Sequence, residues 1–421
     1  MDRYKKLLSN TMIFAIGTFG SKMLVFLLMP LYTRVLSQSQ YGIVDLIVQA
    51  SNLLIPIASI GINNSIIRFG LERNINKKGV MTVGLLTILS GFFIMHDRSN
   101  GLGGGFAGYG IYPQYKEYYA FHIFYENAVV KSDCEAFLNG HFDLINLSKI
   151  PVRKTPKITD EPLIWRYFVK PLPTKIADTQ LDEDEYVMRC VMKINTRFPG
   201  AYVFSSGKNM GVFKAVGFPE DVGAYYRLDE YEGYSWTAHG RYPTNTPGWW
   251  GGAHPFAMLD YSIVHNGEIS SYDTNRRFIE MFGYNCSLQT DTEAITYIFD
   301  YLVRKKGLTL EETAHVIAAP FWSTIERRDS KEKEILTYLR NAFSPLLITG
   351  PFSILLGFTG GIMALNDRLK LRSMVIGEKD EKVYMASEES AIRAVCENLD
   401  KIWAPKGGEP VIVRLNGGVE I

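Results

Sequence analysis

Three long apolar stretches in the first 95 residues place the strongest limit on how this chain can fold. They cover residues 11–33, 41–67 and 79–95, and each approaches the roughly 20 residues that a helix needs to cross a bilayer. Their only charged residues are Lys22 and Asp45, which a bundle of helices can turn inward. The pattern predicts two or three transmembrane helices, with buried helices of a soluble protein as the alternative. A secretory signal fits poorly, because the apolarity recurs without a small-residue cleavage site.

Charge separates this head, residues 1–95, from the body, residues 96–421. The head holds nine Lys and Arg against three Asp and Glu, and the body holds 36 against 41. The basic residues before the first stretch and after the second both favour the cytoplasmic side; they are Arg3, Lys5 and Lys6, then Arg68, Arg73, Lys77 and Lys78. A spanning third stretch would place the body outside the cytoplasm. Alternatively, that stretch lies in the membrane interface or packs on the body.

The head also carries a family resemblance. FLLMPLYTRVLSQSQYGIVDLI at residues 26–47, with Pro30, Arg34, Tyr41 and Gly42, resembles the first helices of polysaccharide and oligosaccharide flippases. Those transporters are many-helix bundles, and three helices cannot enclose a transport pathway. We therefore expect a membrane-associated fragment of a flippase rather than a transporter.

The body predicts an α+β domain. The chain is 47% apolar and 13% aromatic, which supplies an ample core. GLGGG, within residues 96–113, is not followed by the GK[ST] of a phosphate loop and predicts a tight turn that leads into a strand. Further strands are expected within 118–127, 164–172 and 198–219, and an acidic helix is expected over 181–198.

Later segments predict more strands. Residues 344–366 are uncharged, but their glycines and Pro351 argue against a membrane helix and favour two buried strands. Residues 374–395 predict a hairpin followed by a helix capped at Ser387, with Glu388 and Glu389 in its first turn. The last eleven residues, 411–421, predict a hairpin at the edge of a sheet.

Four motifs follow one another between residues 234 and 294. They read YSWTAHGRYPTN, AHPF, SIVHNGEIS and LQTDTEA. Their order and spacing resemble the glutamine-binding half of class II glutamine amidotransferases, and the glycine-rich segment resembles the archaeal-type glutamate synthases within that group. The resemblance implies a four-layer αββα sandwich of the N-terminal nucleophile hydrolase type for residues 96–421.

The resemblance also assigns roles that the chemistry of glutamine supports. Arg241 can hold the α-carboxylate through two parallel hydrogen bonds, and Asp291 can accept from the α-ammonium group. Asn266 and Gly267 can stabilise the tetrahedral oxyanion with a side-chain amide and a backbone N–H. His265 is the remaining expected substrate-binding residue.

Each motif has an ordinary structural alternative. An arginine after a strand often forms a surface ion pair, Asn-Gly often forms a hairpin turn, and TDTE is a common helix start. His239, His254 and His265 suggest a metal trio, but turns and strands surround them and we expect no metal. No cofactor site is expected either.

The catalytic nucleophile of the family is missing. Class II enzymes attack glutamine with a cysteine at the mature N-terminus, whose own α-amino group is the general base. The text upstream of the glycine-rich segment, TVGLLTILSGFFIM at 82–95, contains no cysteine, so the first strand of the sandwich is missing as well. Ser99 could replace the cysteine as nucleophile only if the chain were cleaved directly before it. The cysteines follow no zinc or disulfide spacing and fit a reduced cytoplasmic body: Cys134, Cys190, Cys286 and Cys396.

Three hypotheses follow for the whole chain. In the first, the body is a glutamate-synthase-class amidotransferase domain that has lost its nucleophile, through a gene fusion or an assembly error with its junction near Met95. In the second, an unforeseen nucleophile keeps it active. In the third, the chain is a membrane-tethered, non-catalytic glutamine-binding or scaffold protein. An intact relative would pass ammonia to a synthase subunit with flavin and iron–sulfur centres, and no nucleic-acid partner is expected.

Overall fold

The computed structural model describes residues 95–96, 99–241, 248–415 and 418–420, which form helices and antiparallel strands. The chain divides into two compact units, Met1–Asn74 and Ile75–Ile421, and every described residue belongs to the second. The predicted flippase-like helices lie outside the described residues. Among the residues that are described, none of the helices combines the length and the apolarity needed to cross a bilayer.

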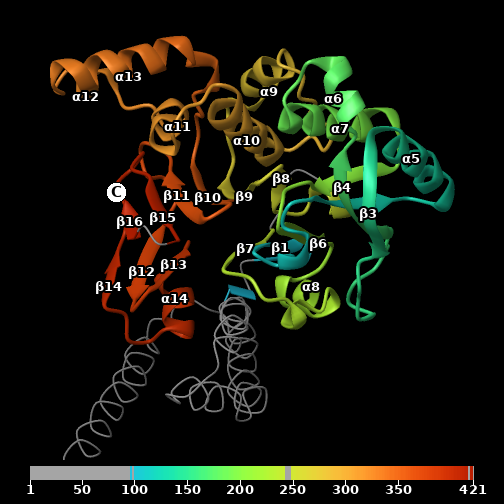
Figure 1. Ribbon diagram of the computed structural model, residues 1–421. Coiled ribbons are helices and arrows are strands. Elements are labelled where there is room, and N and C mark those ends of the chain that lie inside the picture. The colour runs from blue at the N-terminus through green and yellow to red at the C-terminus, as the bar shows by residue number, and fades with distance from the viewer. Residues whose placement is uncertain (1–94, 97–98, 242–247, 416–417, 421) are drawn as a thin grey trace, which may run out of the picture. The chain divides into compact units, whose positions relative to one another are not determined.

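Four antiparallel sheets organise the described residues (Figure 1). We name each after one strand. The β1 sheet has the order β6 (Met210–Ala215), β1 (Gly104–Tyr109), β7 (Ser235–Gly240). The β9 sheet has the order β16 (Gly418–Glu420), β15 (Val411–Arg414), β11 (Gly361–Asn366), β10 (Phe352–Phe358), β9 (Tyr261–Gly267), β8 (Phe256–Met258). The β2 sheet has the order β3 (Phe142–Lys149), β4 (Leu163–Pro171), β2 (Tyr119–Tyr125), β5 (Ala201–Ser205), and the β12 sheet has the order β13 (Lys382–Ala386), β12 (Val375–Lys379), β14 (Lys401–Trp403).

The glycine-rich segment forms the central strand of the β1 sheet. All six residues of β1 are buried, and Gly105 pairs with Lys214 on one side and His239 on the other. A Cβ at Gly105 would lie 2.2 Å from the carbonyl oxygen of His254, a distance that no side chain can accommodate. The predicted turn and strand are confirmed, because the glycines permit close packing of two backbones.

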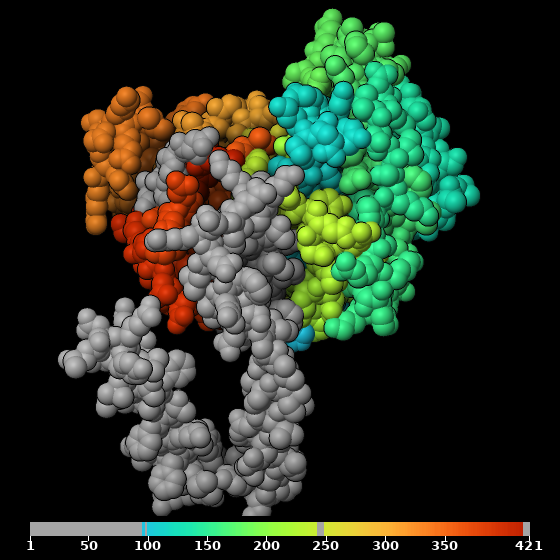
Figure 2. Space-filling view, turned by 60° about the horizontal axis from the view of Figure 1, so that its bottom comes forward, coloured from blue at the N-terminus to red at the C-terminus, as the bar shows by residue number. Residues whose placement is uncertain are grey.

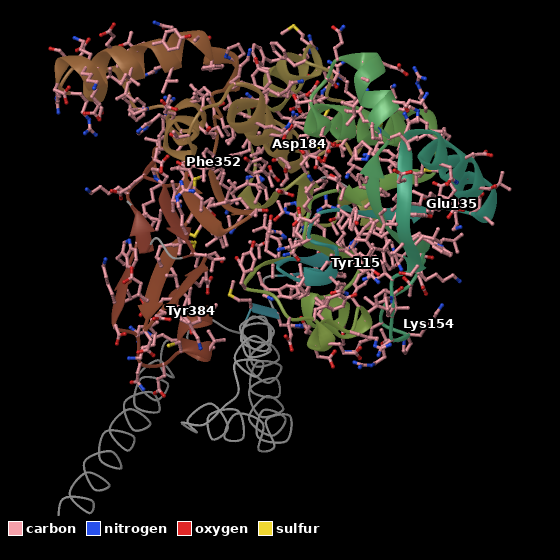
Figure 3. All side chains as sticks on the ribbon, in the orientation of Figure 1. Tyr115, Glu135, Lys154, Asp184, Phe352 and Tyr384 are labelled. Carbon is pink, nitrogen blue, oxygen red and sulfur yellow. The ribbon has the colours of Figure 1, made fainter. Side chains whose placement is uncertain are left out.

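Helices cover the outer faces of two sheets that pack against each other. Helix α8 (Pro219–Tyr225) contacts the β1 sheet, the β1 sheet contacts β9 and β10, and helix α10 (Asp291–Asp300) contacts β8 and β9. Tyr109 of β1 joins the two sheets through a 2.7 Å hydrogen bond between its hydroxyl and that of Ser262. Side chains fill the spaces between the layers, among them Phe352 of the larger core cluster (Figure 3).

The predicted acidic helix is α7 (Glu183–Arg197), which begins where the Asp182 side chain accepts from the N–H of Glu185. It packs on the β2 sheet together with α5 (Ala128–His141). The other α-helices of the described residues are α6 (Pro173–Thr179), α9 (Tyr272–Glu280), α11 (Leu310–Ile317), α12 (Trp322–Ile325), α13 (Ser330–Ala342) and α14 (Glu389–Val395). Helix α13, orange in Figures 1 and 2, lies at the margin of the described part of the chain.

The segment 344–366 forms strands β10 and β11, as predicted, and they pair directly with each other. The final hairpin is also confirmed, since β15 and β16 pair at the edge of the β9 sheet. The predicted cap of α14 was wrong by one residue. The helix begins at Glu389 after Glu388, without a side-chain cap, because the carbonyl of Ser387 accepts from the Ser373 hydroxyl and stays outside the helix.

Candidate functional site

Arg241 lies directly after β7 in a buried position. Its backbone N–H donates to the carbonyl of Gly103 at 2.8 Å, and its side chain leaves the residue only 8% exposed. A Cβ at Gly252 would lie 3.0 Å from Nη1 of Arg241, so this glycine makes room for the guanidinium. Burial lowers the pKa of Arg241, and the nearby carboxylate of Asp291 acts in the opposite direction. The structure thus brings Arg241 and Asp291 close together.

Asp291 is the first residue of helix α10. The Thr290 side chain caps this helix by accepting from the N–H of Glu293 at 3.2 Å, and the helix dipole favours a carboxylate here. Burial acts to raise the pKa of Asp291, but interactions with His265 and Thr292 outweigh it and the pKa lies below its ordinary value. His265 Nδ1 is 3.6 Å from Asp291 Oδ1. Asp291 is therefore ionised at neutral pH and can accept from a cationic group.

Asn266 and Gly267 end strand β9 and do not form the hairpin turn that Asn-Gly often indicates. They pair with Ser353 and Phe352 of β10. Gly267 has a φ of +153°, and a Cβ there would lie 2.0 Å from the carbonyl oxygen of Pro351. Asn266 is exposed at this end of the strand. Both residues come after His265 in the same strand, and His265 itself lies near Asp291.

The three histidines of the motifs gather behind this region. The rings of His239 and His254 stack with centroids 4.2 Å apart, and His254 Nδ1 accepts from the backbone N–H of His265 at 3.4 Å. The hydroxyl of Thr292 lies 3.3 Å from His254 Nε2 and 3.2 Å from His265 Nδ1. Because Nδ1 of His254 accepts, its proton resides on Nε2 and is donated to Thr292.

Burial lowers the pKa of His239 to about 3 and that of His254 well below its usual range. Both rings are therefore neutral. They stack on each other instead of directing their nitrogen atoms toward one point, as ligands of a shared metal ion would. No set of three His, Cys, Asp or Glu side chains that could hold a metal ion occurs in the described residues. The histidines and Thr292 fix the back of the site. Sequence reasoning assigned no role to Thr292 and considered His254 only as a possible metal ligand, although the motifs TDTE and AHPF contain them.

A buried lysine and a buried glutamate, which sequence reasoning missed, lie near these histidines and Thr292. Lys214 is 0% exposed, donates to the carbonyl of Gly251 at 2.9 Å and lies 4.3 Å above the Phe256 ring. Glu293 is 1% exposed and accepts from the N–H of Leu288 and from the hydroxyl of Tyr297. Burial lowers the pKa of Lys214 to about 7 and raises that of Glu293 to about 8. The one sequence feature that could have predicted the buried lysine is its position between apolar residues in VFKAV.

Glu293→Gln should make the protein progressively more stable than the native chain as the pH rises from 5 to 8. A carboxyl whose pKa is raised to about 8 in the folded state keeps its proton there, while the unfolded chain loses it near 4.5. Its stabilising contribution is present at low pH and is lost as the pH rises through this window. Glutamine keeps an acceptor oxygen without the ionisation. We expect a relative gain of about 1–3 kcal/mol, measured by urea unfolding at both pH values; a difference independent of pH would contradict this.

Comparison with known proteins places these residues in a family. Residues 135–416 match the family described as class-II glutamine amidotransferases, and residues 7–95 match the one described as polysaccharide biosynthesis protein. An uncharacterized protein of Archaeoglobus fulgidus is 50% identical over 349 residues, which are 82% of this chain and 92% of that protein.

Relatives with a named activity are more distant. The amidophosphoribosyltransferase of Methanocaldococcus jannaschii is 27% identical over 51% of this chain and 42% of its own length. The glutamine amidotransferase-like protein GlxB of Rhizobium meliloti is 26% identical over 49% of this chain and 60% of its own. This chain thus spans about half the length of these two relatives. Among solved structures, the allosteric regulatory enzyme of purine biosynthesis aligns with 76% of this chain and 48% of its own, at 13% identity and a TM-score of 0.37.

Proposed function

We propose, from the premise that this chain belongs to the class II glutamine amidotransferases, that its body binds glutamine and does not hydrolyse it. The observation that carries the proposal is the electrostatic interaction of Asp291 with Arg241, together with the 3.6 Å approach of Asp291 to His265 of β9. A cation and an ionised carboxylate in one buried region match the two charges of an α-amino acid. Glutamine is the substrate of this family.

In the proposed complex the guanidinium of Arg241 binds the α-carboxylate, and the carboxylate of Asp291 accepts from the α-ammonium group. These contacts direct the side-chain amide of glutamine toward Asn266 and Gly267, whose amide and N–H would stabilise an oxyanion there. His265 contributes by holding Asp291. Since Arg241 is buried, its bond to a carboxylate is stronger than the same bond in water.

Hydrolysis also needs a nucleophile, and the three buried cysteines of the body are poor candidates. Burial raises the pKa of Cys134 and of Cys190 to about 11 and raises that of Cys286 further. Their thiols remain protonated at neutral pH, whereas the thiolate is the reactive form. Ser99 lies beside the site, but among the described residues its hydroxyl donates to a backbone carbonyl, that of Arg241 at 3.1 Å, rather than to a general base. Binding without turnover follows.

Three finer assignments belong to the same proposal. The packing of α8, the β1 sheet, the β9 sheet and α10 supports a four-layer sandwich of the N-terminal nucleophile hydrolase type without its first strand. The glycine-rich segment supports the glutamate synthase class, whose intact members act with a flavin and iron–sulfur synthase subunit. The body belongs in the cytoplasm by analogy with that class.

A second candidate function is a membrane-tethered, non-catalytic glutamine-binding or scaffold protein. The match of residues 7–95 to the polysaccharide biosynthesis family favours it, together with the apolar stretches of the head. In this case residues 11–95 anchor the chain, and glutamine binding rather than ammonia production is what the body contributes.

Calorimetric titration of the full-length protein with L-glutamine, beside a glutamate-release assay, tests the proposal. We expect saturable binding of L-glutamine, no binding of D-glutamine and no glutamate above the buffer control. Glutamate release by the native chain would reveal an unforeseen nucleophile. Absence of binding would refute the pocket. Repeating the titration after reconstitution into vesicles, followed by flotation, separates the anchored form from an unanchored one.

A further inference from the structure

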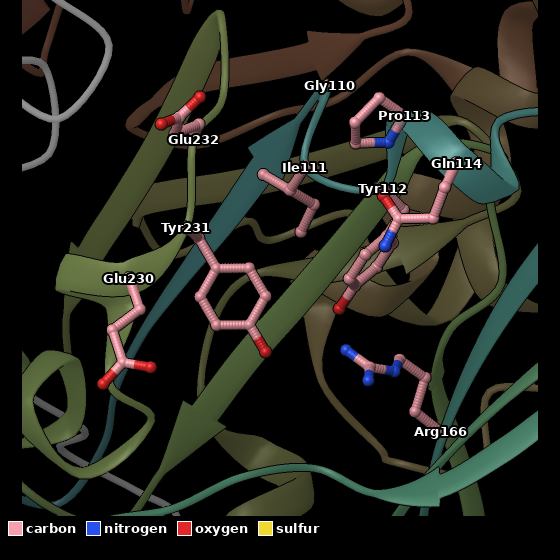
Figure 4. A pocket seen from close by; sticks show the side chains of 9 residues that line it. All are labelled: Gly110, Ile111, Tyr112, Pro113, Gln114, Arg166, Glu230, Tyr231 and Glu232. Carbon is pink, nitrogen blue, oxygen red and sulfur yellow. The ribbon is translucent and has the colours of Figure 1, made fainter. Parts of the chain in front are cut away.

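A second cavity, of about 540 Å³, lies beyond the other end of strand β1 (Figure 4). Its walls come from the turn after β1, from β4 and from the segment that precedes β7. The lining residues are Gly110, Ile111, Tyr112, Pro113, Gln114, Arg166, Glu230, Tyr231 and Glu232. Arg241 bonds to Gly103, just before β1, and the cavity begins at Gly110, just after it. Six strand residues span about 20 Å, so the cavity is distinct from the proposed glutamine pocket.

Arg166 supplies the cationic wall of this cavity. Its guanidinium lies 5.0 Å from the centre of the Tyr112 ring and 5.3 Å from that of Phe168, and Nη2 donates to the Ser148 hydroxyl at 3.2 Å. Nε is buried without a hydrogen-bond partner. In the part of the chain that is described, the groups acting on this guanidinium are tyrosines rather than a carboxylate. A partly buried cation without a counter-ion costs free energy that a bound anion would offset.

The hydrogen bonds behind Tyr112 fix the direction of its proton. His122 Nδ1 lies 2.8 Å from the carbonyl oxygen of Val212, which can only accept, so Nδ1 carries the proton. Burial lowers the pKa of His122 to about 3, so the ring is neutral and Nε2 accepts from the Tyr112 hydroxyl at 3.0 Å. The Tyr112 hydroxyl therefore faces Arg166 with its lone pairs, which favour the positive charge of the guanidinium. Its proton is already donated to His122, so Tyr112 does not donate to a bound anion.

Tyr231 faces the same guanidinium from the other side of the cavity. In Figure 4 its hydroxyl points toward Arg166, as does that of Tyr112. The Tyr231 hydroxyl interacts with the Tyr112 hydroxyl and with the Arg166 guanidinium. Because Tyr112 donates its proton to His122, Tyr231 can donate to Tyr112, and an anion, as the stronger acceptor, can take this proton instead. Glu230, at the rim, is already neutralised by Arg227, whose Nε donates to it at 2.7 Å.

We propose that this cavity binds the oxyanion group of a small molecule, a carboxylate or a phosphate, between Arg166 and the hydroxyl of Tyr231. The fork of guanidinium N–H groups matches either group in a two-point contact. The aromatic rings of Tyr112 and Tyr231 form walls suited to the apolar part of such a molecule. This site is independent of glutamine binding, because it uses none of the residues of the first pocket.

The test is a calorimetric titration of the full-length protein carrying Arg241→Ala, which silences the first pocket. Inorganic phosphate and succinate are the two probes. Saturable binding of either supports the site and identifies the preferred group; binding of neither overturns it. Arg166→Met should weaken the binding at least tenfold, and Tyr231→Phe should weaken it by a smaller factor.

Arg153→Met is the matched control, because Arg153 is an exposed arginine that lies 3.8 Å from Glu230 and does not line the cavity. In the Arg241→Ala protein, adding Arg153→Met should leave the affinity for phosphate or succinate unchanged. Equal weakening by Arg153→Met and Arg166→Met would mean a general charge effect and would overturn the proposal. If Arg166→Met does not fold, Tyr231→Phe, which keeps the ring, decides the question, and unchanged binding in it then counts against the site.

Discussion

Replacing residues 1–95 by a cysteine-initiated strand and helix from an intact class II amidotransferase should give a protein that hydrolyses glutamine, whereas we expect the native chain to release no glutamate. In the proposed pocket Arg241, Asp291, Asn266 and Gly267 surround the glutamine, so the chimera adds only the nucleophile and its α-amino group. Removing a nucleophile typically costs several orders of magnitude in rate. We therefore expect a gain of at least about a thousandfold.

The measurement is glutamate release by the native and the chimeric proteins, both purified at full length. The matched control is the same chimera with alanine in place of its first cysteine, which preserves the added strand and helix. Activity confined to the cysteine-initiated chimera would establish a sound pocket that lacks its nucleophile. An inactive but folded chimera that binds glutamine would show that the body misplaces the amide relative to the first residue.

The sequence predicted those parts of the fold that depend on neighbouring residues. The strands within 344–366 and the strand after the glycine-rich turn were confirmed, because alternation, glycine and proline act locally. Helix α7 was confirmed because its acidic first turn and its cap lie in one stretch. The cap at Ser387 failed because a contact with Ser373, fourteen residues away, holds that residue outside the helix.

The parts of the site that escaped prediction depend on distant contacts. Lys214 is an ordinary strand residue until Gly251 and Phe256, about forty positions later, enclose its side chain. Thr292 resembles a common residue of a helix start, yet its hydroxyl connects His265 of β9 with His254, which precedes β8. The order of the motifs led us to predict Arg241 and Asp291 as site residues. No local sequence pattern indicates which buried groups hold these two side chains in place.

The same reasoning applies to the second cavity. Arg166 sits in a strand of mixed exposure, IWRYFVKPL, which indicates a strand and nothing about a ligand. Its environment arises from Tyr112, about fifty residues earlier, and Tyr231, about sixty-five later. A site assembled by one residue from each of three elements leaves no contiguous motif in the sequence.

Arg241→Ala should weaken the binding of L-glutamine by at least about a hundredfold. The buried guanidinium is the group proposed to hold the α-carboxylate, and charge-assisted hydrogen bonds contribute about 1.5–3 kcal/mol each, with every 1.4 kcal/mol worth about tenfold in affinity. Arg241→Lys keeps the charge but loses the paired N–H donors of the guanidinium. Its affinity for glutamine should therefore lie between those of the native chain and Arg241→Ala. Titration calorimetry of the full-length variants gives the affinities, and circular dichroism verifies that each is folded.

Arg277→Ala is the control for this substitution, because Arg277 lies on α9, is 74% exposed and pairs only with Asp273 within the described residues. Its affinity for glutamine should match that of the native chain. Unchanged affinity in a folded Arg241→Ala protein would remove the pocket assignment, since no other contact in the proposal holds the α-carboxylate. A loss in Arg241→Ala accompanied by an intermediate affinity in Arg241→Lys would instead attribute the recognition to the geometry of the guanidinium as well as to its charge.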